Sequence, residues 1–134
     1  MSCQNSKKIV EISDKIAIIA VADGHGSSKC PRSDRGSMIA VNSFYEVMKN
    51  YINAYGDDEK GLSNLITFLN REGDMRFAQN VCEEWQARVK KSFYKNKVAE
   101  MTDEKGNIKW QSVFSLYGTT LLGILVTDSF VFSF

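Results

Sequence analysis

A run of apolar residues that leads into an acidic, glycine-rich loop constrains this chain most. Residues 16–21 read Ile-Ala-Ile-Ile-Ala-Val, which is typical of a buried strand. Asp23, Gly24 and His25 follow closely, so the strand would carry a carboxylate and the single histidine of the chain to its C-terminal end. Functional groups are often placed at such ends, because the strand holds them rigidly and the loop leaves them accessible.

These residue types suit cation binding and proton transfer. Asp23 can offer carboxylate oxygens to a divalent cation, and Gly24 lets a backbone carbonyl approach the same ion because it has no Cβ. His25 can transfer a proton near neutral pH. The simpler alternative is a strand that ends in an Asp-Gly turn beside a surface histidine, and residues 22–27 taken alone favour that alternative.

Two more segments change the balance when they are read together with this loop. Residues 21–29 (Val-Ala-Asp-Gly-His-Gly-Ser-Ser-Lys), followed by Ile-Ala-Val at 39–41, resemble the bacterial branch of the metal-dependent protein phosphatases, the PP2C or PPM family. Residues 117–123 (Tyr-Gly-Thr-Thr-Leu-Leu-Gly) resemble the glycine-threonine strand motif of that family. Residues 3–5 (Cys-Gln-Asn) are similar to its Cys-Gln-Asp near the start. The three matches keep the family's order and extend over nearly the whole chain.

The distribution of hydrophobic residues predicts an α+β fold, with strands first, helices next and strands last. Strands are expected at 9–12, 16–21, 118–127 and 130–134, helices at about 33–55, 62–69 and 78–93, and a further strand from 108 to 113. The expected helix caps are Ser33 or Asp34 for the first helix and Asp74 for the third. Several of these strands are apolar on both faces, which predicts a sheet buried between two layers. For residues 1–134, the resemblance implies the N-terminal part of a single PPM-type phosphatase domain, an α-β-β-α sandwich of two antiparallel sheets flanked by helices and incomplete at the C-terminus.

The resemblance also implies a function. Members of this family are serine/threonine protein phosphatases, which hydrolyse phosphoserine or phosphothreonine with a water activated by two manganese or magnesium ions. Carried over by motif, Asp23 would bridge the two ions, the Gly24 carbonyl would bind one of them, and His25 would protonate the leaving oxygen. Asn5 stands where the family carries a metal-binding aspartate.

Two departures from the family's pattern weaken the implied site. The amide oxygen of Asn5 can bind a hard cation, but without the negative charge of an aspartate. The family's glycine-aspartate motif and its further metal-binding aspartates would fall after Phe134. We therefore expect weak Mn²⁺ or Mg²⁺ binding and no useful phosphatase activity from these 134 residues alone. Gly118 and Thr119 are expected to be structural, and Arg32 a surface or helix-entry residue.

Two other hypotheses stay open. A phosphatase-like fold without catalysis, acting as a binding or regulatory module, would fit Asn5 and the missing aspartates. An unrelated metal-dependent hydrolase, or a plain α+β domain, would require three ordered motif matches to arise by chance.

Charge, hydrophobic runs and cysteine content bear on the classes of binding partner and on the location of the protein. A net charge of +1 gives no electrostatic case for nucleic acid or an anionic membrane as a partner. The substrate that the resemblance implies is a phosphoserine or phosphothreonine protein. No apolar run, 121–126 included, is long enough to span a membrane, and the polar N-terminus has no signal-peptide core. Cys3, Cys30 and Cys82 are widely spaced, which predicts reduced thiols and a cytoplasmic location. The last apolar strand has no following neighbour, which predicts self-association through it.

Overall fold

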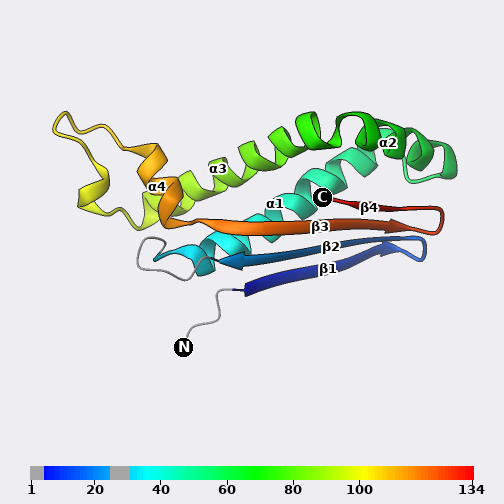
Figure 1. The fold of residues 1–134 in the computed structure, drawn as a ribbon, viewed down its shortest axis with the longest axis horizontal. Helices are drawn as coiled ribbons and strands as arrows, with labels where there is room; N and C mark the ends of the chain where they lie inside the picture. The colour runs from blue at the N-terminus through cyan, green and yellow to red at the C-terminus, as the bar shows by residue number, and fades with distance from the viewer. Residues whose placement is uncertain (1–4, 25–30) are drawn as a thin grey trace.

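A four-stranded antiparallel sheet with helices packed on one face forms the protein (Figure 1). The computed structural model describes residues 5–24 and 31–134. The strand order is β1-β2-β3-β4. The strands are β1 (Asn5–Ser13), β2 (Ile16–Gly24), β3 (Thr119–Thr127) and β4 (Val131–Ser133). Two hairpins far apart in the sequence therefore meet where β2 pairs with β3.

The helical layer is contributed by the segment between the two hairpins. It contains α1 (Ser33–Tyr55), α2 (Glu59–Glu72), the π-helical turn η1 (Gly73–Phe77), α3 (Ala78–Lys95), the short 3₁₀ helix η2 (Ala99–Met101) and α4 (Trp110–Leu116). Helix α1 packs against the sheet, and α2 and α3 pack against α1 (Figure 1). No helix in residues 5–24 and 31–134 is both long and apolar enough to cross a membrane. The predicted α+β class is confirmed.

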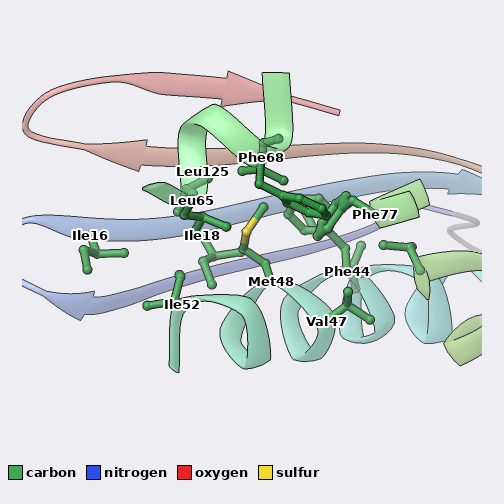
Figure 2. Packing of buried hydrophobic residues seen from close by; sticks show 14 of the residues in the cluster. Ile16, Ile18, Phe44, Val47, Met48, Ile52, Leu65, Phe68, Phe77 and Leu125 are labelled. Carbon is green, nitrogen blue, oxygen red and sulfur yellow. The ribbon is translucent and has the colours of Figure 1, made fainter. Parts of the chain in front are cut away.

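The core lies between the sheet and α1 (Figure 2). Alternate residues of β2 point into it, as the period of a strand requires. The buried side chains that line this interface include Ile16, Ile18, Ala20, Ala22, Phe44, Met48, Ile52, Leu65, Phe77 and Leu125. The ring of Phe44 packs edge-on against Phe77 with centroids 5.8 Å apart. Gly123 makes room for this ring, since a Cβ built there would lie 2.2 Å from it.

The opposite face of the sheet differs from the prediction of burial between two layers. Within the described residues that face is not covered, and several of its large apolar side chains are exposed. They include Ile9 (63% exposed), Val21 (44%), Leu122 (51%) and Val131 (64%). The structure therefore contains one antiparallel sheet with one helical side, and a second sheet is not found among the residues it describes.

Three local predictions are wrong. Helix α1 is preceded by Arg32 at the cap position without a side-chain cap bond, so neither Ser33 nor Asp34 caps it. Asp74 caps nothing, because the π-helical turn carries the chain from α2 into α3 without a break. The strand expected from 108 to 113 is replaced by α4, whose buried Val113 contributes to a second small core with Val89, Phe93 and Tyr117.

Helix α2 has a side-chain cap, which gives a testable prediction. Asp58 Oδ1 accepts a hydrogen bond of 2.7 Å from the backbone N–H of Gly61. Replacing Asp58 with alanine is expected to lower the free energy of unfolding by about 1 kcal/mol, because this N–H loses its partner. Thermal unfolding should show a decrease of roughly 3–5 °C in Tm. Asp57→Ala, at the exposed neighbouring position, should leave Tm nearly unchanged; an equal decrease in both variants would contradict the capping role.

Candidate metal centre

The first two strands bring Asn5 and Asp23 together at one end of the sheet. Asn5 is the direct partner of Asp23 in the β1–β2 pairing, and Thr120 is its partner in the β2–β3 pairing. Directly opposed residues lie on the same face with Cβ atoms about 4.5–5.5 Å apart. Both Asn5 and Asp23 are exposed. The amide and the carboxylate therefore lie side by side on the uncovered face.

Gly24 is the last residue of β2 and adds a backbone carbonyl next to these side chains. It is half-buried and pairs with Thr119 of β3. His25, Cys3 and Gln4 lie outside the described residues. The structure thus places three of the four predicted site residues, Asn5, Asp23 and Gly24, within two adjacent strands.

Thr120 of β3 is hydrogen bonded to the end of β2. The hydroxyl of Thr120 donates a hydrogen bond of 3.2 Å to the carbonyl oxygen of Asp23. The hydroxyl of Thr119 donates one of 2.9 Å to the carbonyl oxygen of Thr120. The Thr120–Asp23 bond holds the backbone from which the Asp23 carboxylate projects, whereas the Thr119 bond lies within β3. Sequence reasoning missed Thr120, although its place beside Thr119 in the Gly-Thr-Thr motif was the available signal.

The strand that carries Asn5 is also tied to the helical layer. The hydroxyls of Ser6 and Ser37 are hydrogen bonded at 2.9 Å, which links β1 to the first turns of α1. Lys8 lies over the ring of Tyr45 of α1, with its Nζ 4.8 Å from the ring centroid. Even-numbered residues of this part of β1 therefore face α1. Asn5, by the alternation of a strand, faces the other way.

Arg32 acts as an anchor at the start of α1. Its backbone N–H donates a hydrogen bond of 2.8 Å to the carbonyl of Leu116, and its Nη1 donates one of 2.9 Å to the hydroxyl of Tyr117. Its guanidinium also lies over the rings of Phe93 and Tyr117, at 5.8 and 5.7 Å from their centroids. These contacts agree with the expected helix-entry role. They also occupy the Arg32 guanidinium with contacts inside the protein.

The donors present fit a hard divalent cation in part. Carboxylate, amide and backbone carbonyl oxygens are the ligands that Mg²⁺ and Mn²⁺ accept, and the Asn5–Asp23–Gly24 group offers one of each. Among residues 5–24 and 31–134, however, no three His, Cys, Asp or Glu side chains gather into a metal-binding group. The described group therefore supplies a single negative charge in an exposed setting, which favours weak binding.

Comparison with known proteins extends over the same motifs. The family profile described as Protein phosphatase 2C matches residues 1–134. No curated protein and no solved structure matches the chain. The family match spans the whole sequence and includes the strand that ends at Asp23 and Gly24. The chain therefore belongs to the protein phosphatase 2C family.

Proposed function

We propose that these 134 residues are the N-terminal portion of a metal-dependent serine/threonine protein phosphatase, whose substrates are phosphoserine and phosphothreonine proteins. The observation that carries the proposal is the pairing of Asn5 with Asp23, beside the Gly24 carbonyl, in a chain of this family. These are oxygen donors on one exposed face, where a phosphorylated side chain can approach them.

Each residue has a role in this proposal. Asp23, Asn5 and the Gly24 carbonyl hold Mg²⁺ or Mn²⁺, and the backbone of Asp23 is kept in place by Thr120. A bound ion of this kind lowers the pKa of a water and offsets the charge on phosphoryl oxygens. His25 supplies the proton that the leaving hydroxyl of serine or threonine requires.

A non-catalytic binding or regulatory module remains the second candidate. One observation favours it: the residue opposite Asp23 is a neutral asparagine, so the pair carries one charge where two carboxylates would carry two. A module of this kind would still bind phosphoprotein, but would not turn it over. Manganese binding that depends on Asp23 separates the two candidates, because a module has no need of the ion.

Calorimetric titration with Mn²⁺ tests the proposal. We expect wild type to bind with a Kd of about 1 mM, the weak end of protein oxygen sites. Asp23→Ala should remove the binding heat, because the only carboxylate of the group is lost. Asp34→Ala, which removes an acidic side chain from the first turn of α1, is the matched control and should bind as wild type does. Equal binding by Asp23→Ala and wild type would refute the assignment.

The remaining parts of the proposal concern architecture and location. A second sheet against the uncovered face would complete the four-layer sandwich that the resemblance implies. A cytoplasmic location rests on the spacing of the three cysteines, of which Cys82 is described and carries an exposed, unbridged thiol. Self-association through the outer edge of β4 also remains a prediction, since that edge has no strand partner among the described residues.

A further inference from the structure

A cluster of arginine and hydroxyl side chains lies where α1, α3 and the segment before β3 meet. Arg32 Nη1 donates a hydrogen bond of 2.9 Å to the hydroxyl of Tyr117, and Arg35 Nη1 donates one of 3.4 Å to Ser92 Oγ. The hydroxyl of Tyr117 donates one of 3.5 Å to Ser92 Oγ. These contacts join four side chains that are far apart in the sequence, and we call them the arginine–hydroxyl cluster.

The arginine–hydroxyl cluster is rich in donors and lacks a charged acceptor. A guanidinium carries five N–H donors, and each of the bonds above uses one of them. The ion pairs among the described residues involve other arginines, so neither Arg32 nor Arg35 meets a carboxylate there. The hydroxyl proton of Ser92 also has no acceptor in the described part of the chain. The cluster therefore offers two positive charges and several free donors to an acceptor from outside.

The surroundings hold the two arginines in place without covering them. Tyr117 is fully buried, so its hydroxyl forms the floor of the cluster, whereas Arg32 and Ser92 are half-buried and Arg35 is exposed. The Arg32 guanidinium lies over the rings of Phe93 and Tyr117, as described above. Such stacking uses the faces of the planar group and leaves its remaining in-plane N–H donors available.

Neighbouring charges do not neutralise the cluster. Asp34 lies between the two arginines in the sequence, but adjacent residues of a helix do not face each other, and it forms no ion pair among the described residues. The N-terminus of α1 carries the positive end of a helix dipole, and the nearby C-terminus of α3 carries the negative end of another. These two effects oppose each other, so the arginines decide the sign of the local charge.

We propose that the arginine–hydroxyl cluster binds a phosphate group, either as inorganic phosphate or on a phosphorylated side chain. Such a group carries a charge of about −1.5 to −2 near neutral pH and presents three strong acceptor oxygens. Arg32 and Arg35 bind it through paired N–H···O bonds, and Ser92 donates its free proton to it. Tyr117 positions Arg32 from below without touching the ligand. The inference does not rest on the proposed phosphatase chemistry, because none of these residues belongs to the candidate metal centre.

Calorimetric titration with inorganic phosphate, on protein dialysed free of divalent cations, tests the site. We expect saturable binding in the millimolar range. Arg35→Gln should weaken it at least tenfold, because one of the two guanidiniums is lost. Arg35→Lys keeps the charge without the planar fork and should also weaken it several-fold. Arg71→Gln is the matched control, since it removes the same charge from a side chain of α2 that is 69% exposed, and should bind as wild type does.

A substitution at Ser92 gives a second readout whose sign a folding defect cannot imitate. Ser92→Asp places a carboxylate of the chain itself beside the two arginines, so it should remove phosphate binding. It should also raise Tm above that of Ser92→Asn, which has the same shape without the charge. An acidic residue in the last turn of a helix otherwise lowers Tm, because it meets the negative end of the dipole. Circular dichroism of each variant checks that it is folded.

A peptide competition identifies the source of the phosphate group. A short phosphoserine peptide with alanine on both sides should displace inorganic phosphate, and the unphosphorylated peptide should not. Tighter binding of the phosphopeptide than of inorganic phosphate would assign a phosphorylated side chain as the ligand, and equal or weaker binding would assign free phosphate.

Three outcomes would overturn the proposal. One is the absence of saturable phosphate binding. Another is equal weakening by Arg35→Gln and Arg71→Gln, which means that net charge alone attracts the anion. The third is a Ser92→Asp variant that is less stable than Ser92→Asn. None of these outcomes bears on manganese binding, because the titrations contain no divalent cation.

Discussion

Replacing Gly36 with alanine is expected to lower the free energy of unfolding by about 3 kcal/mol or more, because it overpacks a contact between two backbones. A Cβ at Gly36 would lie 1.9 Å from the carbonyl oxygen of Tyr117 and 2.7 Å from the carbonyl carbon. No side chain there can rotate away. Alanine would gain about 1 kcal/mol of helix propensity in exchange, which is too little to offset the clash. Urea denaturation measures the difference.

The contact between Gly36 and Tyr117 also affects the candidate metal centre, because α1 is bonded to the strand that carries Asn5. Gly36 lies one residue before Ser37, which is bonded to Ser6 of β1, and its carbonyl accepts a hydrogen bond of 3.2 Å from Trp85 Nε1. Pushing α1 away from Tyr117 would therefore disturb both the helical layer and the strand that carries Asn5. Gly106→Ala is the control. Its φ of 84° makes alanine unfavourable by about 1–2 kcal/mol, and a Cβ there would meet nothing within 4 Å. If Gly36→Ala costs no more than Gly106→Ala, the close approach of α1 to Tyr117 is wrong.

All three expected helices and four of the five expected strands are present in the structure. The apolar runs at 16–21 and 118–127 correspond to β2 and β3, and turns at Asp14 and Asp128 join the strands into two hairpins. Strand β1 is longer than predicted and begins at Asn5. Its polar residues alternate between α1 and the uncovered face, so no hydrophobic run announced its start. A local hydrophobic pattern reveals only strands that bury apolar side chains. The start of this edge strand is held by pairing with β2 and by polar contacts with α1, so the pattern did not reveal it.

The helical errors have a different cause. Ile108, Trp110 and Val113 suggest a strand only if Phe114 and Tyr117 are left out. Residues 110, 113, 114 and 117 have the three- and four-residue spacing of a helix. Gly73 and Asp74 are typical of a helix end. The chain nevertheless continues through a π-helical turn, in which Gly73 packs against the ring of Phe132, with 3.1 Å from a built Cβ to the ring. That contact is between segments about sixty residues apart, so local sequence could not reveal it.

The motif alone pointed to Asp23 and Gly24, but their neighbours depended on strand register. A slip of one residue would turn Asn5 to the helical face, because side chains alternate along a strand. The register also shifts between Glu11 and Ser13, an irregularity that the sequence does not announce. Weak similarity at residues 3–5 suggested that Asn5 belongs to the site. The strand pairing places Asn5 directly opposite Asp23, as membership in the same site requires.

Replacing Asn5 with aspartate is expected to raise the affinity for Mn²⁺ at least tenfold. The substitution keeps the shape of the side chain and places a second carboxylate directly opposite Asp23, about 5 Å away between Cβ atoms. A divalent cation is bound more tightly as the number of charged ligands rises. Calorimetric titration beside wild type measures the gain. Without the ion, the two like charges repel each other, so the same variant should unfold at a lower temperature than wild type.

Asn5→Asp should thus lower Tm without the ion and strengthen Mn²⁺ binding, and a control variant separates this metal-site effect from a general effect of charge. Ser13→Asp is the control. It adds the same charge to the other end of the nine-residue strand β1, at an exposed position far from Asp23. It should change neither the Mn²⁺ affinity nor the response of Tm to the ion. In Asn5→Asp, by contrast, Mn²⁺ should raise Tm by more than it does in wild type, because binding to the folded state alone stabilises it in proportion to affinity. Equal gains in the two variants would mean that net charge attracts the ion, whereas no gain in either would remove Asn5 from the site.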